Sequence, residues 1–206
     1  MNLRLIAIGM LAAFAGVLGA VAFIPGAIDG LLPKRTKITT GKALVGGPFQ
    51  LTTQTGARAR DTDFRNKLMI VDFGFTHCPD VCPAALQLIT AALDKIGSKA
   101  DQIAPLFITV DPERDTPQQL KLYMSSFHKN LIGLTGSAKE ISQVAKAYRI
   151  YYRKVKSEAL NEYTMDHSSL IYLMDGNGEF ITYFPHTTPP DKMAEKLAAE
   201  VAKLKR

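Results

Sequence analysis

Apolar runs of strand length alternate with longer amphipathic segments along this chain. The runs LMIVDFGF (68–75) and PLFITV (105–110) flank a segment over 81–95 whose apolar residues have helical spacing. Such alternation is typical of β-α-β units, in which a helix connects two parallel strands. The pattern therefore predicts an α/β fold.

The second half of the chain carries local signals for further helices and strands. Thr116 is suited to cap a helix, and Ser137 with Glu140 forms a capping-box pattern. The runs LIYLM (170–174) and EFITYF (179–184) flank Asp-Gly-Asn-Gly, which predicts an antiparallel hairpin. A last amphipathic helix is expected at the C-terminal end. We predict a sheet with parallel and antiparallel parts, covered by helices on both faces.

The N-terminal part carries a membrane-targeting signal. After a short segment over 1–4, twenty uncharged residues follow over 5–24, enough to cross a hydrocarbon layer of about 30 Å as a helix. We expect a transmembrane anchor here, with a signal peptide as the alternative. Residues 25–42 are rich in Pro, Gly and Lys and indicate a linker, which leaves 43–206 as one folded domain.

Charge and targeting bound the location and the partners. The formal net charge is +6, but the basic residues are scattered and not interleaved with aromatic ones, so we expect no nucleic-acid partner. An anchor or a signal makes the residues from 25 onward a candidate for the exported side, where a cysteine pair can be oxidised. No leader rich in Arg and Ser precedes Leu5, which favours a single-pass protein of the bacterial inner membrane, with its soluble domain in the periplasm, over a mitochondrial one.

Cys78 and Cys82 are the only cysteines among the 206 residues. They lie in FGFTHCPDVCP (73–83), where a predicted strand turns into a predicted helix. The amides and the dipole at a helix N-terminus stabilise thiolates. Residues four apart in a helix share one face, so both sulfurs can bind one metal ion, but the same spacing also permits a disulfide. An inert structural pair is the third alternative.

Two thiolates leave a metal site incomplete. Structural zinc normally takes four Cys or His ligands, and the chain has no further cysteine. Reduced copper prefers thiolate, whereas imidazole suits both copper oxidation states, so two cysteines and one histidine would form a plausible copper site. His167 is the best candidate of the four histidines, because in a thioredoxin-like sheet the loop before such a late strand faces the cysteine turn. A hydrogen-bonded structural role for His167 stays open.

The remaining candidates for ligands are weaker: His77, His128 and His186. The first is adjacent to a cysteine, so its side chain should point away from the sulfur, and we expect the other two to be solvated. Asp166 could orient the imidazole of His167, as carboxylates behind metal ligands often do. Met165 could add a thioether, although methionine more often fills a core.

The segment VDPERDTP (110–117) has two interpretations. Asp111 follows a predicted strand at the ligand-bearing edge, where it could accept a hydrogen bond behind the metal ligands or belong to a partner surface. The simpler interpretation is a turn at Pro112, followed by helix entry at Asp115 to Pro117. We favour the simpler one.

Four segments together resemble the Sco/SenC family of copper-assembly proteins for cytochrome c oxidase: GGPFQLTTQTG (46–56), IVDFGFTHCPDVCP (70–83), ITVDPERDTPQQL (108–120) and YTMDHSSLIYLMDGNGEF (163–180). With the N-terminal segment, the resemblance spans nearly the whole chain. The sequence departs little from the family's pattern. One departure is Met165, which stands where many relatives have valine, and this change affects packing more than ligation.

The resemblance implies a membrane-anchored protein of thioredoxin-like fold that binds copper, as Cu⁺ and also as Cu²⁺, through Cys78, Cys82 and His167. It implies a metallochaperone and not an enzyme, which takes copper from an upstream donor protein and helps to assemble the binuclear copper centre in the copper-bearing subunit of cytochrome c oxidase. Some family members are credited with thiol reductase activity. A thiol-disulfide oxidoreductase that keeps that subunit's cysteines reduced through a Cys78–Cys82 redox disulfide is therefore the alternative.

Overall fold

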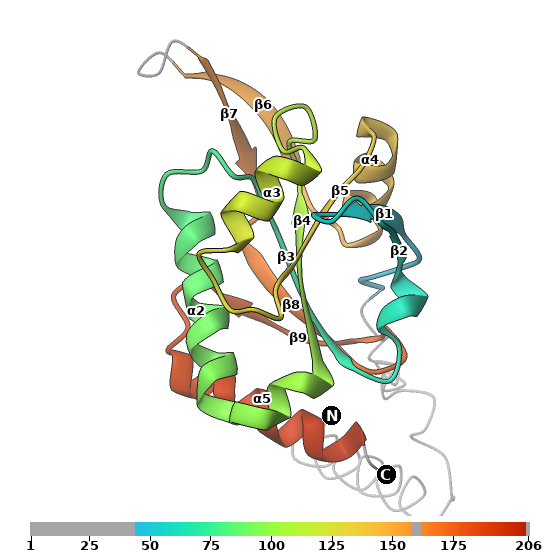
Figure 1. Cartoon of the computed structure of the whole chain (residues 1–206), viewed down its shortest axis with the longest axis vertical. Coiled ribbons are helices and arrows are strands. Elements are labelled where there is room, and N and C mark those ends of the chain that lie inside the picture. Colours follow the sequence, from blue (N-terminus) through green and yellow to red (C-terminus); the bar gives the residue numbers. More distant parts are fainter. Residues whose placement is uncertain (1–43, 158–161, 205–206) are drawn as a thin grey trace, which may run out of the picture. The chain divides into compact units, whose positions relative to one another are not determined.

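The computed structural model describes residues 44–157 and 162–204 (Figure 1). The predicted transmembrane segment over 5–24 and the predicted linker over 25–42 lie outside the described residues. In the part of the chain that is described, no helix is both long and apolar enough to cross a membrane.

A seven-stranded mixed sheet carries the fold, with the strand order β2-β1-β5-β4-β3-β8-β9. Its strands are β1 (Gln50–Thr53), β2 (Arg58–Arg60), β3 (Leu68–Gly74), β4 (Ile103–Thr109), β5 (Ile132–Thr135), β8 (Leu170–Met174) and β9 (Phe180–Pro185). The strands β3, β4 and β5 run parallel, whereas β1 and β8 pair antiparallel with their neighbours in this sheet. This arrangement confirms the predicted α/β sheet of mixed direction.

Helices cover both faces of the sheet centre. They are α2 (Val81–Ile96), α3 (Pro117–Met124), α4 (Ala138–Ala147) and α5 (Pro190–Leu204), with two short 3₁₀ helices, η1 (Asp61–Phe64) and η2 (Gly97–Gln102). Every residue of β3 and β4 is buried, and successive side chains of a strand point to opposite faces. Both faces of these strands are therefore covered, as predicted. The helix α2 packs beside α5, and α3 packs against β5 (Figure 1).

The helix starts read from the sequence are in place. The Thr116 hydroxyl accepts a hydrogen bond from the Gln119 amide at 3.2 Å. At α4, Ser137 and Glu140 form the predicted capping box. The Ser137 amide, followed by the Arg58 guanidinium, lowers the pKa of Glu140 to about 2. Arg58 belongs to β2, so the cap of α4 also ties this helix to the edge of the sheet.

One hairpin was missed in the sequence. The strands β6 (Tyr152–Ser157) and β7 (Glu162–His167) form a separate two-stranded sheet that projects from the end of the domain (Figure 1). Both strands are rich in charged residues, and their sequences lack the regular alternation of apolar and polar residues that indicates a half-buried strand. We expected His167 in a loop, but it is the last residue of the strand β7.

Candidate metal-binding and dithiol site

Three segments meet at the edge of the sheet where β3 and β4 end. These two strands are parallel, with Gly74 opposite Thr109, so the loops that follow them emerge side by side. The strand β8 is antiparallel to β3, so the chain enters β8 at the same edge. The cysteine turn after β3, the loop over 110–117 and the end of β7 are therefore neighbours.

The two sulfurs occupy different positions at the start of α2. Cys78 precedes the helix and Cys82 lies in its first turn. The Cys82 amide donates a hydrogen bond to the Cys78 sulfur at 3.4 Å, so this sulfur caps the open end of the helix. Both thiols are free, and Cys82 is buried whereas Cys78 is half-buried. A reagent or partner would therefore meet Cys78 first.

The surroundings also divide the protons between the two sulfurs. The hydrogen bond shared with the Cys82 thiol, and after it the interactions with His167 and the Asp80 amide, lower the pKa of Cys78 to about 4 against the opposing effect of burial. The same bond to Cys78, together with burial, raises the pKa of Cys82 far above its ordinary value. The hydrogen bond between the two sulfurs therefore favours the thiolate form at Cys78 and the protonated form at Cys82.

His167 lies against the sulfur pair. Its Nε2 is 3.6 Å from the Cys82 sulfur, and its Nδ1 is 3.0 Å from the Ser168 carbonyl oxygen. A carbonyl can only accept, so Nδ1 carries a proton and Nε2 faces the sulfur. Burial lowers the pKa of His167, but Cys78, Ser168 and Asp72 together outweigh it, so the net pKa is raised.

The distance between sulfur and nitrogen suits one shared ion. Bonds of about 2.3 Å from thiolate and 2.0–2.1 Å from imidazole, as found at zinc, separate the two donors by roughly 3.5–3.8 Å at angles of about 109–120°. The 3.6 Å between Cys82 and His167 falls in this range. Across residues 44–157 and 162–204, no three His, Cys, Asp or Glu side chains are already arranged as a metal cluster. The Cys82–His167 pair is the part of the site whose geometry is in place.

Asp72 is a residue of the site that sequence analysis did not single out. It lies on β3, is 3% exposed, and lines a small cavity with Cys82 and His167. Its Oδ2 has no hydrogen-bond partner among the described residues. Burial raises the pKa of Asp72 from 3.8 to about 7, although the nearby His167 opposes this effect. The signal that could have pointed to Asp72 is the presence of one acidic residue inside an otherwise apolar strand.

The two carboxylates that could have stood behind the ligands make other contacts. Asp166 is exposed and faces Arg153 at 3.4 Å, and neighbouring residues of a strand point to opposite faces. Asp111 is fully buried and accepts hydrogen bonds from Arg114 and from the Tyr163 hydroxyl. Their role behind a metal remains a prediction from the sequence.

The other candidate ligands are placed as follows. His77 has 45% of its side chain exposed and its Nδ1 lies 3.9 Å from an oxygen of Asp115. His186 is exposed, as predicted, and also lines the small cavity beside Cys82. His128 was predicted to be solvated, but only 10% of its side chain is exposed, because it packs near α2. Met165 is buried in the core, as we favoured.

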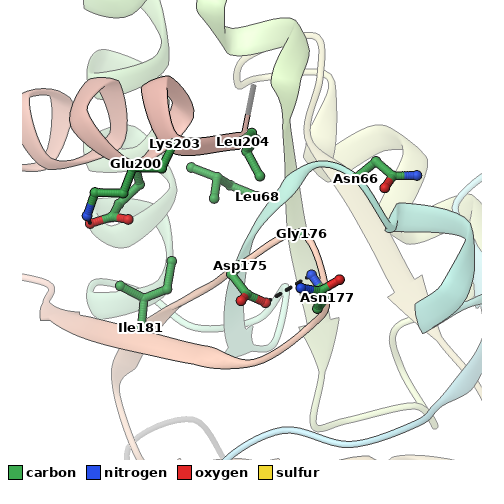
Figure 2. A pocket seen from close by; sticks show the side chains of 9 residues that line it. All are labelled: Asn66, Leu68, Asp175, Gly176, Asn177, Ile181, Glu200, Lys203 and Leu204. Carbon is green, nitrogen blue, oxygen red and sulfur yellow. Dashed lines mark hydrogen bonds and ion pairs between the residues drawn. The ribbon is translucent and has the colours of Figure 1, made fainter. Parts of the chain in front are cut away.

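A separate cavity lies at the other end of the strands, where β3 begins (Figure 2). It has a volume of about 390 Å³ and is lined by residues from the start of β3, the β8–β9 turn and the end of α5. Its polar groups bond to one another: Lys203 donates to Glu200 at 2.8 Å, and the Asn177 amide donates to Asp175 at 2.9 Å. We assign no ligand to it.

The fold and the site together define a class of protein. The sheet has a thioredoxin-like arrangement, a cysteine pair lies at the start of a long helix, and a histidine lies beside the sulfurs. These features are those of a thioredoxin-like dithiol protein. The sequence model of the family SCO1/SenC matches residues 37–202. The chain therefore belongs to the SCO1/SenC family.

Individual relatives agree with this membership. The chain is 41% identical over 172 residues to the human mitochondrial protein SCO1 homolog, covering 82% of this chain and 57% of the human protein. The structure of Bradyrhizobium japonicum ScoI with copper bound is 46% identical, with a TM-score of 0.71, covering 76% of this chain and 99% of that one. A structure of BsSco, described as having a disulfide switch and as a member of the Sco family of cytochrome c oxidase assembly proteins, is 25% identical with a TM-score of 0.60, covering 76% of this chain and 92% of that one.

Proposed function

We propose that this chain is a copper metallochaperone that binds copper through Cys78, Cys82 and His167 and helps to assemble the binuclear copper centre of cytochrome c oxidase. The observation that carries the proposal is the 3.6 Å approach of His167 Nε2 to the Cys82 sulfur. The copper bound to the related ScoI of B. japonicum supports the choice of metal. Two thiolates suit Cu⁺, and the imidazole suits both Cu⁺ and Cu²⁺.

Binding changes the protonation of the site. Cys78 is already a thiolate at neutral pH, with a pKa of about 4, whereas Cys82 must lose its proton to become a ligand. Copper binding therefore releases a proton from Cys82. Asp72 lines the same small cavity, and with a pKa of about 7 its carboxylate is suited to take up that proton. His167 offers Nε2 because Nδ1 is held by Ser168.

The redox state of the cysteines gates loading. Oxidation by a disulfide-bearing partner removes two electrons from the Cys78 thiolate and the Cys82 thiol, releases the proton of Cys82 and forms a Cys78–Cys82 disulfide, which cannot bind copper. Reduction by a thiol donor restores the ligands, and copper then leaves by ligand exchange to a partner. The disulfide switch described for BsSco supports this cycle.

The location and partners follow from the same proposal. The domain over 43–206 is tethered by the linker over 25–42 and the membrane anchor over 5–24 to the bacterial inner membrane, with the domain in the periplasm. It receives copper from an upstream donor protein. It delivers copper to the copper-bearing subunit of the oxidase, which lies in the same membrane.

A second function is favoured by the unequal cysteines. The half-buried Cys78 thiolate beside the buried Cys82 thiol matches the attacking and resolving pair of a thiol-disulfide oxidoreductase. Cys78 would attack a disulfide of the oxidase subunit and form a mixed disulfide, releasing one thiol. Cys82 would then displace the second thiol and leave this chain oxidised.

A copper titration separates the two functions. The reduced protein is titrated with Cu⁺ against a chelator of known affinity, in the wild type, His167→Ala and His186→Ala. We expect one tightly bound copper, at least a roughly tenfold loss of affinity in H167A, which corresponds to about 1.4 kcal/mol, and no change in H186A. Near-normal affinity in H167A would remove this ligand from the proposal. A wild type that binds no copper but reduces a disulfide substrate would favour the oxidoreductase.

A further inference from the structure

The loop over 110–117 contacts both halves of the candidate site. It follows β4 and enters α3 at Pro117, so the turn and helix entry predicted from VDPERDTP are present. Its buried side chains, however, bond mainly to two other segments of the chain. One segment leads into the cysteine turn, and the other is the strand that ends at His167.

The first contact is made by Asp115, which is fully buried. Its Oδ1 accepts a hydrogen bond from the Thr76 hydroxyl at 2.6 Å, and its Oδ2 accepts one from the Thr76 amide at 3.0 Å. Oδ2 also accepts a hydrogen bond from the Thr109 hydroxyl at 2.5 Å. Thr76 lies two residues before Cys78, so Asp115 fixes the start of the cysteine turn to the end of β4.

The second contact joins Asp111 and Arg114 to Tyr163 on β7. Asp111 accepts hydrogen bonds from the Tyr163 hydroxyl at 2.9 Å and from Arg114 Nε at 2.5 Å. Arg114 also donates to the Tyr163 carbonyl oxygen at 3.1 Å, and its guanidinium carbon lies 3.9 Å from the centre of the Tyr163 ring. Residues i and i+4 of a strand share one face, so this contact holds the face of β7 that carries His167.

A third contact links Arg114 to His167 through the ring of Phe75. The Arg114 guanidinium carbon lies 5.9 Å from the centre of the Phe75 ring. That ring meets the His167 ring edge-on, with the ring centres 5.8 Å apart. Phe75 is 2% exposed and directly precedes Thr76. Arg114 is thus linked to His167 by one intervening ring on one side and by Tyr163 on the other.

The histidine strand depends on such side-chain contacts. The strands β6 and β7 pair with each other in a two-stranded sheet outside the main sheet, and an isolated hairpin of this kind is marginally stable. We infer that Arg114 is a positioning residue that sets the approach of His167 to the sulfurs, and that the loop over 110–117 couples the two halves of the site. This inference rests on the proposed binding of copper by Cys82 and His167.

A double-mutant cycle tests the inference. Cu⁺ affinity is measured for the reduced full-length protein and for Arg114→Lys, His167→Ala and the double variant. Lysine keeps the charge but loses the planar fork that stacks on Tyr163 and donates to two acceptors. We expect R114K to weaken copper binding roughly five- to tenfold when His167 is present and less than about twofold when it is absent, because neighbouring positions couple. The control is Arg153→Lys, since Arg153 lies exposed on the same hairpin and faces Asp166; it should change nothing.

A metal-free measurement keeps this result separate from the proposed function. In the reduced protein without copper, NMR should show cross-relaxation between the Phe75 and His167 rings in the wild type and in R153K, and should show it weakened in R114K. Tyr163→Phe removes only the hydroxyl that bonds to Asp111 and serves where R114K does not fold. Unchanged ring contacts, or equal losses of copper affinity with and without His167, would overturn the inference. Normal Cu⁺ affinity in H167A would instead overturn the assignment of His167 as a ligand. In that case the NMR contacts between the Phe75 and His167 rings would still test the role of Arg114.

Discussion

Cys78 and Cys82 are four residues apart but differ chemically. The Cys78 sulfur caps a helix and has a pKa of about 4, whereas the buried Cys82 keeps its proton. Sequence analysis predicted that the helix start would favour thiolates. It did not predict the asymmetry, because this depends on which sulfur precedes the helix and which one the core encloses.

The asymmetry predicts the rate of alkylation. In the reduced, metal-free protein, Cys78 should react with iodoacetamide at a rate that is nearly constant from pH 6 to pH 8, because a group with a pKa of about 4 is already ionised there. Cys82 should stay unmodified until the protein unfolds. Mass spectrometry of quenched samples measures both. A Cys78 rate that rises about tenfold per pH unit would indicate an ordinary thiol, with a pKa of about 8.5.

Asp72 should make stability depend on pH. Its pKa is 3.8 in an ordinary setting and about 7 in the fold, so the folded state binds the proton more tightly, and stability falls as the pH rises from about 4 to 7. Asp72→Asn has no charge to bury. We expect it to be more stable than the wild type by up to about 4 kcal/mol above pH 7, at about 1.4 kcal/mol per pKa unit, and to lose this advantage near pH 4. Urea unfolding at pH 4 and pH 8 measures the difference, and an equal difference at both would contradict the account.

Among the elements, the end of β3 is the one most closely fitted to the site. A Cβ on Gly74 would stand 2.8 Å from the Cys82 sulfur and 2.7 Å from a ring carbon of Phe107. A glycine is therefore needed where β3 passes under the first turn of α2. The sulfur position depends on this contact between strand and helix as well as on the cysteine turn itself.

Gly74→Ala should therefore disturb both stability and copper binding. Overpacking of this kind costs about 1–3 kcal/mol, and relief by moving Cys82 would change its distance from His167. The matched control is Gly133→Ala on β5, where a Cβ would stand 3.1 Å from a Met124 side-chain carbon and away from the cysteines. Thermal unfolding and the Cu⁺ competition titration should show loss of stability in both variants and loss of copper affinity in G74A alone. Normal copper affinity in G74A would contradict this role of β3.

The elements also show how far the sequence could be interpreted. Apolar runs gave β3, β4, β8 and β9, and capping residues gave the starts of α3 and α4. The β6–β7 hairpin was missed because Tyr163 and Lys154 tie it to the loop over 110–117 by polar contacts, which leave no periodic apolar pattern in the sequence. Asp72 was missed for a related reason, since the meaning of one acid in an apolar strand depends on neighbours that are distant in sequence.

At the scale of the whole molecule, the site is assembled by topology. Parallel pairing of β3 with β4 and antiparallel pairing with β8 bring the cysteine turn, the loop over 110–117 and the end of β7 to one edge. This convergence is why one histidine could be selected from four in the sequence. It also explains why local patterns could not give the contacts of Asp111, Arg114 and Tyr163, which join segments about fifty residues apart.

The ligand set of the bound metal can be measured by X-ray absorption at the copper edge of the Cu⁺-loaded, reduced protein. If copper binds through Cys78, Cys82 and His167, we expect one copper ion with two sulfur neighbours and one imidazole nitrogen, and loss of the nitrogen alone in His167→Ala. A wild-type spectrum with two sulfurs and no imidazole, unchanged by that substitution, would contradict it.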